Sequence, residues 1–141
     1  MRVVRADPGF IYQIHQSFGE YLRDQKSELA KLQRNGDEWL YRFSNPCFFV
    51  FLALHGKQVV GMTWGETKPW CHKAVIEGFF VRRKFRGKIR GVRALAVALK
   101  GFLKDNSVRG VEAQVPEQNK SFVARKGFSP QGVVMEAKWI R

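Results

Sequence analysis

The sequence predicts an α/β fold in which a single mixed sheet is flanked by helices. Two observations lead to this fold class. Apolar runs of strand length recur along the chain, and between them lie stretches whose apolar residues are spaced three or four apart, as on one face of a helix. Their order is strand, two helices, three strands, helix, strand, helix, strand. The 141 residues contain no repeat, low-complexity segment or linker, so we expect a single domain over residues 1–141.

The first third of the chain predicts a strand followed by two helices. Residues 2–6 form a short apolar run, and Asp7 with Pro8 favours a helix start, because Asp caps free amides and Pro is tolerated in the first turn. The apolar positions of this first helix are Phe10, Ile14, Phe18, Tyr21 and Leu22. A second helix is expected over 27–36, and residues 37–43 continue its pattern by another turn.

The middle third predicts three consecutive strands. Residues 47–56 are almost entirely apolar, and HGKQ at 55–58 has the composition of a tight hairpin turn. The chain is then expected to return over 58–66, pass through a loop at 67–73 and enter a third long strand at 72–81.

The last third predicts alternating helices and strands. In order, they are a helix from Ile89 to Lys104, a strand over 109–115, a short helix over 119–126 and a final strand over 133–139. Gly127 and Phe128 are expected to turn the chain into that final strand.

The chain is strongly basic, with 25 Lys and Arg residues against 12 Asp and Glu residues and a net charge of +13. Such a surplus favours an anionic partner, whether a nucleotide cofactor, nucleic acid, an acidic protein or a membrane surface. No apolar stretch reaches the roughly 18 residues of a membrane span, and the N-terminus lacks the apolar core of a signal peptide. We therefore expect a cytoplasmic protein with no membrane partner.

The cysteine and histidine residues do not predict a metal site. Cys47 and Cys71 fit no disulfide framework or metal-ligand spacing, so we expect free thiols. The three histidines are scattered along the chain and are expected to be ordinary surface or core residues.

A basic turn, RRKFRGKIRG at 82–91, separates the third long strand from the long helix. The first four amides of a helix lack intrahelical partners and lie at the positive end of its dipole. Glycine there lets an anion approach the backbone, so the turn predicts a phosphate cradle built from Arg86, Gly87, Lys88, Arg90 and Gly91. A solvated basic face without a ligand is the alternative, but the dipole disfavours cations at a helix start. The spacing fits neither the P-loop nor the dinucleotide fingerprint.

The segment FFVRRKFRGKIRG, 79–91, resembles the signature of the GCN5-related N-acetyltransferase (GNAT) family. Val81 lies five residues before Arg86, and Gly91 lies five residues after it. The element order and the closing segment NKSFVARKGF, 119–128, resemble the same family, so the resemblance covers essentially the whole chain. It implies the GNAT-like acyl-CoA N-acyltransferase fold, with a mostly antiparallel sheet, acetyl-CoA as cofactor and transfer of the acetyl group to an amine.

The resemblance also implies a site. Residues of the third strand would pair with the pantetheine arm, the basic turn would wrap the pyrophosphate, and the start of the last helix would lie near the pantetheine. The implied cofactor-binding residues are Phe79, Phe80, Val81, Arg86, Gly87, Lys88, Ile89, Arg90, Gly91 and Asn119. Two positions depart from the family pattern. Ile89 replaces the first glycine of the motif, and Val123 replaces a tyrosine that usually protonates the departing thiolate.

Glu77 matches the strand position that often carries the general base in this family. It is the only acidic residue between Glu66 and Asp105, and burial in an apolar strand is expected to raise its pKa toward neutrality. The alternatives are a structural pair with a nearby Lys or Arg and a solvated carboxylate. Gly78, beside it inside the strand, suggests a bulge or a close backbone approach.

Weaker candidates complete the predicted site. Ser121 and Cys71 are the options for a general acid. Trp64, Trp70 and Phe79 could line an acceptor groove, although aromatic residues in strands are more often part of a core.

Two functions of different classes remain open from the sequence. The first is a CoA-dependent N-acetyltransferase with an unidentified amine acceptor. The second is a catalytically silent, basic GNAT-like module that binds nucleic acid non-specifically or an acidic protein, for example as a virion component of a phage, in which case it would lie in the host cytoplasm or the virion. The departures at Ile89 and Val123 favour the second function, and the retained Glu77, Arg86, Gly91 and Asn119 favour the first. The resemblance also allows a homodimer.

Overall fold

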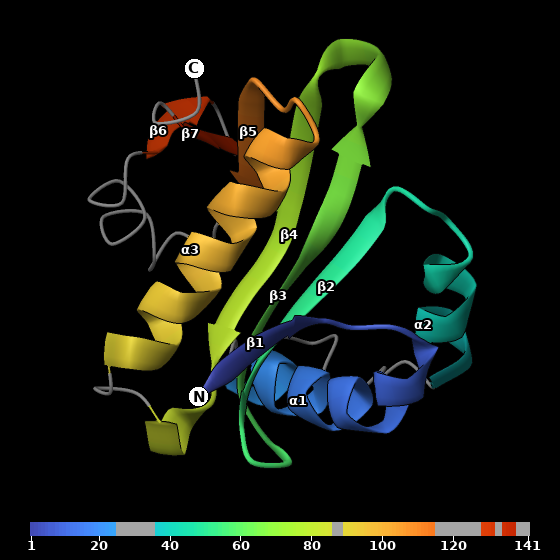
Figure 1. The fold of residues 1–141 in the computed structure, drawn as a ribbon, viewed down its shortest axis with the longest axis vertical. Coiled ribbons are helices and arrows are strands. Elements are labelled where there is room, and N and C mark those ends of the chain that lie inside the picture. Colours follow the sequence, from blue (N-terminus) through green and yellow to red (C-terminus); the bar gives the residue numbers. More distant parts are fainter. Residues whose placement is uncertain (25–35, 86–88, 115–127, 132–133, 138–141) are drawn as a thin grey trace.

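A computed structural model gives the fold and describes residues 1–24, 36–85, 89–114, 128–131 and 134–137 (Figure 1). The described residues form one seven-stranded sheet in the order β1-β2-β3-β4-β5-β7-β6. Five of its neighbouring pairs are antiparallel, and β4 with β5 is parallel. The predicted fold class, a mixed and mostly antiparallel sheet flanked by helices, is therefore confirmed.

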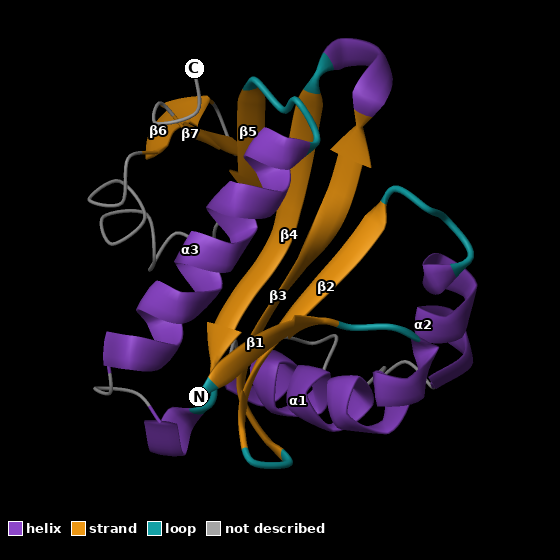
Figure 2. Cartoon of the chain, viewed as in Figure 1, coloured by secondary structure: helices purple, strands orange, loops and turns teal. Residues whose placement is uncertain are grey.

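Figure 2 shows the distribution of strands and helices along the chain. The strands are β1 (Arg2–Arg5), β2 (Phe48–His55), β3 (Gln58–Lys68), β4 (Lys73–Val81), β5 (Gly110–Gln114), β6 (Phe128–Gln131) and β7 (Val134–Ala137). The helices are α1 (Ile11–Asp24), α2 (Gly36–Phe43) and α3 (Ile89–Asp105), with short 3-10 turns η1 (Pro8–Phe10), η3 (Pro69–Cys71) and η4 (Arg83–Phe85). No helix in the described ranges is long and apolar enough to cross a membrane.

The sheet is covered on both faces, by α3 on one and by α1 and α2 on the other (Figure 1). Strand β2 shows the division. Phe49 belongs to the apolar cluster that contains Leu99 of α3. Its neighbour Val50 belongs to the cluster that contains Ile14 of α1 and Trp39 of α2. Because successive strand residues point to opposite faces, a strand covered on both sides must be apolar throughout, as the sequence of β2 is.

The predicted elements agree with the structure over most of the described chain. The side chain of Asp7 accepts a hydrogen bond from the amide of Gly9, which confirms the predicted cap. The hairpin turn between β2 and β3 places Gly56 at φ 63°, a left-handed conformation that glycine adopts without strain. The helix expected over 119–126, and that over 27–36 apart from its last residue, lie outside the described residues.

Two expectations along the chain were wrong. The loop predicted over 67–73 is shorter, because β3 continues to Lys68 and β4 begins at Lys73. The predicted final strand over 133–139 is present as β7, but Phe128, expected to turn the chain, begins a further strand, β6, which pairs with β7 in antiparallel fashion. Pro130 argued against a strand over 128–131 in the sequence, since proline cannot donate a hydrogen bond to a β-ladder. It is tolerated because β6 is the edge strand of the sheet.

A β-bulge interrupts β4 at Glu77. In the pairing with β3, Trp64 lies opposite Gly78 and the next residue, Gly65, lies opposite Ile76, so Glu77 is the extra residue. The bulge reverses the phase of the strand. Ile76 packs in the α3-side cluster, whereas Phe80, four residues later, packs in the cluster of α1 and α2. In a regular strand these two side chains would share a face.

Gly78 allows the bulge to pack closely against the neighbouring strand, β3. A Cβ atom at this position would lie 2.1 Å from the Trp64 ring, so the ring occupies the space that any side chain would need. The hydroxyl of Thr63 also donates a buried hydrogen bond of 2.7 Å to the Gly78 carbonyl. These contacts confirm the close approach predicted from a glycine within a strand.

We predict that Gly78→Ala destabilises the protein by about 1–3 kcal/mol, because Trp64 must leave its packed position. Gly101→Ala is the matched control. Gly101 lies in α3, where an alanine methyl group would meet no described atom within 4 Å outside its own stretch of helix. Alanine in a helix is more stable than glycine by about 0.5–1 kcal/mol. Urea unfolding should therefore move in opposite directions for the two variants. Equal stability of Gly78→Ala and the wild type would contradict this account of the bulge.

Candidate active site

Strand β4 and strand β5 pair over only part of their length. Their parallel ladder covers Lys73–Ile76 and ends opposite Ala113, whereas β4 continues to Val81. Along the other edge, the pairing of β4 with β3 continues to Val81. Figure 1 shows β5 beside the first half of β4, while the second half continues toward η4. The bulge at Glu77 lies where the β4–β5 ladder ends.

The residues predicted to pair with the pantetheine arm form the end of β4. Phe79, Phe80 and Val81 lie beyond the last pairing with β5. Phe80 and Val81 are buried, and Phe79 is 38% exposed. Phe80 packs its ring edge to face with Tyr21 of α1, with ring centroids 5.5 Å apart.

The basic turn follows β4 directly. The amide of Arg82 donates to the carbonyl of Val60 at 2.9 Å, which extends the β3–β4 ladder by one residue, and the amide of Phe85 donates to the carbonyl of Arg82 at 2.8 Å. Helix α3 then begins at Ile89, and its first turn contains no acidic residue. The amide end of α3 therefore carries its partial positive charge without an internal anion.

The structure describes the predicted pyrophosphate residues unevenly. Ile89, Arg90 and Gly91 form the first residues of α3. Arg86, Gly87, Lys88 and Asn119 lie outside the described residues, as do Ser121 and Val123.

Glu77 is not buried. Its side chain is 36% exposed and forms an ion pair and hydrogen bond with Arg42 of α2. The Arg42 guanidinium also lies over the ring of Phe48, 4.2 Å from its centroid. The expected burial of Glu77 was therefore wrong, because the bulge turns this residue out of the alternating apolar pattern. Of the alternatives considered for Glu77, pairing with a basic residue is the one observed, and such a pair does not exclude a role as a base.

The weaker candidates are spread over the molecule. Trp64 is 3% exposed and belongs to the core between the sheet and helices α1 and α2, whereas Trp70 is 74% exposed. Cys71 is a free, exposed thiol in η3, at the end of β4 opposite to Val81, and Cys47 is also free. No group of metal-ligating side chains occurs among the described residues.

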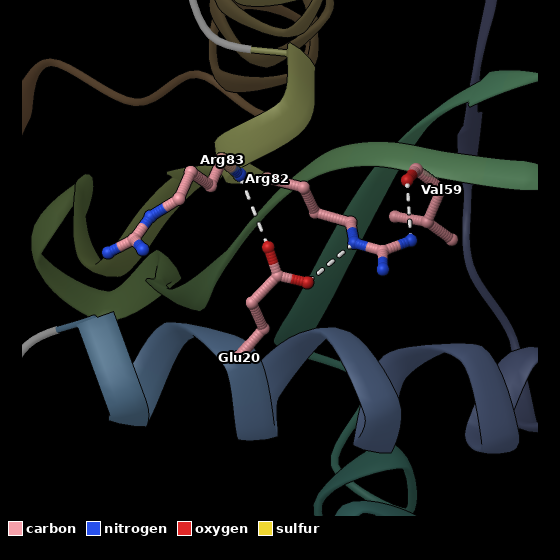
Figure 3. Close-up of polar contacts among 4 residues, drawn as sticks. All are labelled: Glu20, Val59, Arg82 and Arg83. Carbon is pink, nitrogen blue, oxygen red and sulfur yellow. Dashed lines mark hydrogen bonds and ion pairs between the residues drawn. The ribbon is translucent and has the colours of Figure 1, made fainter.

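Sequence reasoning missed two charged residues that contact the second half of β4 and its turn. Arg42 pairs with Glu77, and Glu20 of α1 pairs with Arg82 at 2.8 Å (Figure 3). Neither residue lies in a motif, so only the fold reveals them. Tyr21, next to Glu20, packs against Trp64, and burial raises the pKa of its hydroxyl above the usual value.

The family model for the acetyltransferase (GNAT) family matches residues 10–128. The chain belongs to the GNAT family. This membership confirms the resemblance found in the sequence, and it confirms acetyl-CoA as the cofactor, because acetyl-CoA is the donor that this family uses. No curated protein matches the sequence significantly.

Solved structures of GNAT proteins have the same fold. The PaiA N-acetyltransferase from Thermoplasma acidophilum, in complex with coenzyme A, is 15% identical and has a TM-score of 0.82 over 97% of this chain and 98% of its own. A ribosomal-protein-alanine N-acetyltransferase from Brucella melitensis is 16% identical, with a TM-score of 0.78 over 96% and 98%.

An aminoglycoside acetyltransferase from an uncultured soil metagenomic sample, in complex with sisomicin, is 16% identical, with a TM-score of 0.77 over 94% and 91% of the two chains. At these identities the three likenesses establish the fold.

We predict that Arg42→Gln changes the free energy of unfolding by less than about 1 kcal/mol, because partly exposed ion pairs contribute little. Urea unfolding at low and high salt measures this contribution. Lys73→Gln, which removes the exposed pair between Lys73 and Glu112, is the matched control. A loss of more than about 2 kcal/mol in Arg42→Gln alone would mean that the pair with Glu77 is a structural brace.

Proposed function

We propose that this protein is a CoA-dependent N-acetyltransferase, that residues 1–141 form one catalytic domain, and that the acceptor is an amine. The observation that carries the proposal is the end of the β4–β5 ladder at Ile76, in a GNAT protein whose β4 continues into a basic turn and the start of α3. An extended ligand can lie along a strand beyond the point where its ladder with a neighbouring strand ends. A helix start with no acidic residue suits an anion.

On this account, the residues that the family resemblance implies would hold acetyl-CoA. The end of β4, Phe79–Val81, would hold the pantetheine arm through its backbone, and the turn Arg86–Gly91 would hold the pyrophosphate through amides and basic side chains. Asn119 would lie near the pantetheine. When bound, acetyl-CoA supplies a thioester whose carbonyl carbon accepts the nucleophile. Ile89 puts a side chain where the family pattern has glycine, so amides elsewhere in the turn would carry more of the binding.

Glu77 is the proposed general base. An amine must lose its proton to become the nucleophile, and a carboxylate beside the end of the ladder can take that proton directly or through a water molecule. A bond then forms between the amine nitrogen and the acetyl carbon, the bond to sulfur breaks, and CoA leaves as a thiolate. The thiolate can take its proton from solvent after it leaves, so the absence of the tyrosine at Val123 slows its departure without preventing it.

The ion pair with Arg42 orients the side chain of Glu77, the proposed base. Arg42 lies on the side of the sheet covered by α1 and α2, and its ion pair draws the Glu77 carboxylate toward that side. The basic turn and α3 come after Val81, at the C-terminal end of β4. We infer that the acceptor approaches from the side of α2 and that its ammonium group exchanges with the Arg42 guanidinium at Glu77. The names of two similar structures, an aminoglycoside and a ribosomal-protein-alanine acetyltransferase, support an amine as the acceptor class.

We predict that Glu77→Gln lowers the rate of acetyl transfer by roughly 10²–10⁴, the usual effect of losing a general base. CoA affinity should change little, because the cofactor would pair with backbone beyond Glu77. Release of free CoA thiol in the presence of a panel of amines measures the rate. The matched control is Glu66→Gln, which removes a carboxylate of the neighbouring strand that bonds Asn45. Full turnover in Glu77→Gln would contradict the assignment, and a wild type that binds CoA but acetylates no amine would favour the silent module.

We also predict that the double variant Arg86→Glu, Arg90→Glu weakens CoA binding by tenfold or more, since each charge-assisted hydrogen bond contributes about 1.5–3 kcal/mol. Calorimetric titration measures the dissociation constant. The control is Lys104→Glu, Arg109→Glu, which reverses two exposed charges at the far end of α3 and so matches the change in net charge. Equal affinity of the test and control variants for CoA would contradict the assignment of the turn as the pyrophosphate-binding site.

A further inference from the structure

Glu20 of α1 binds the chain at the point where it leaves β4 (Figure 3). One carboxylate oxygen accepts a hydrogen bond from Nε of Arg82 at 2.8 Å, and the other accepts one from the backbone amide of Arg83 at 3.2 Å. Nη1 of Arg82 donates in turn to the carbonyl of Val59 at 3.3 Å. A single carboxylate thus joins α1, β3 and the beginning of the basic turn.

This contact determines the direction of the Arg82 side chain. Its guanidinium lies between Glu20 and Val59, over the side of the sheet that α1 covers. The side chain is only 20% exposed and Glu20 is 23% exposed. The Arg82 guanidinium is therefore engaged in hydrogen bonds within the protein, although Arg82 belongs to the same basic run as the residues proposed to hold the pyrophosphate.

The same contact holds the first residue of η4. Glu20 binds Arg83 at the start of this 3-10 turn, and the Phe85 amide closes the turn on the carbonyl of Arg82. Phe85 itself packs against the apolar cluster of α3. The segment from Arg82 to Phe85 is thus fixed at one end by α1 and at the other by the core, and three residues separate it from the start of α3.

Electrostatics alone would disfavour an acidic residue at this place. An anionic ligand near the turn is repelled by a carboxylate, and removing that carboxylate should strengthen binding. Glu20 instead directs both of its oxygens at donors of the chain. The presence of Glu20 is explained if fixing the backbone at Arg82 and Arg83 favours ligand binding more than the negative charge of the carboxylate disfavours it.

We propose that Glu20 is a positioning residue for the cofactor: through Arg82 and the Arg83 amide it fixes the backbone that leads into the pyrophosphate-binding turn. This inference rests on the proposed function. It also assigns Arg82 to the support of the turn rather than to contact with phosphate.

The test compares Glu20→Ala, the milder Glu20→Gln and the control Glu112→Ala, which removes an equal charge from an exposed pair with Lys73. Titrants are CoA, followed by calorimetry, and S-acetylpantetheine, which lacks the pyrophosphate, followed by NMR. We expect Glu20→Ala to weaken CoA binding about tenfold or more, the size expected from a lost charge-assisted hydrogen bond, with S-acetylpantetheine affinity unchanged. Glu20→Gln should weaken CoA binding in the same direction but less, so the test survives if Glu20→Ala does not fold. Glu112→Ala should leave the affinity equal or slightly higher.

A double-mutant cycle separates positioning from direct contact. If Glu20 and Arg82 act as one unit, Arg82→Ala should add little to the loss already caused by Glu20→Ala. Additive losses would show that Arg82 binds phosphate itself and would overturn this part of the inference. Equal CoA affinity in the wild type and both Glu20 variants would overturn the positioning role while the proposed function stands. A wild type without affinity for CoA would reject the proposed function itself.

A general structural role for Glu20 has a different signature. It would weaken CoA and S-acetylpantetheine alike, in proportion to the loss of stability, and that result would also overturn the inference. Urea unfolding of each variant provides the comparison. Because the pair is partly exposed, we expect Glu20→Gln to lower the free energy of unfolding by no more than about 1 kcal/mol.

Discussion

The bulge at Glu77 is the constraint on which the rest of the site depends. Trp64 occupies the space above Gly78, and the Thr63 hydroxyl binds the Gly78 carbonyl, so β4 has one more residue than β3 at this point. The extra residue reverses the phase of the strand and places Phe80 on the opposite face from Ile76. The ladder with β5 ends at the same place. One packing contact therefore exposes a carboxylate at the point where the described β4–β5 ladder ends.

Two charged contacts then connect the helices of one face to the two ends of the second half of β4. Arg42 of α2 binds Glu77 at its beginning, and Glu20 of α1 binds Arg82 just after its end. Helix α3 lies on the opposite face and begins a few residues later. On the proposed function, one face of the sheet would serve the acceptor and the start of α3 would serve the cofactor, with the end of β4 between them. This division of roles would follow from which face each helix covers.

The sequence predicted those features that depend on local patterns. The apolar runs of β2 to β4, the spacing in α1 and α3, and the glycine within β4 each reflect neighbours a few residues away. Features that depend on distant partners were missed. Glu77 finds Arg42 35 residues away, and Glu20 finds Arg82 62 residues away. Burial of Glu77 was expected because its strand is apolar. The bulge takes Glu77 out of the regular alternation of the strand, and the apolar composition of the strand gives no sign of this.

Amide hydrogen exchange in the presence and absence of CoA tests most directly whether the end of β4 and its turn form the cofactor site. The account predicts that CoA slows exchange in peptides covering residues 77–91, since backbone groups there would bind the pantetheine and the pyrophosphate. Peptides covering the hairpin between β2 and β3, residues 55–58, should exchange at the same rate with and without CoA. Protection confined to another part of the chain, or no protection at saturating CoA, would contradict the account.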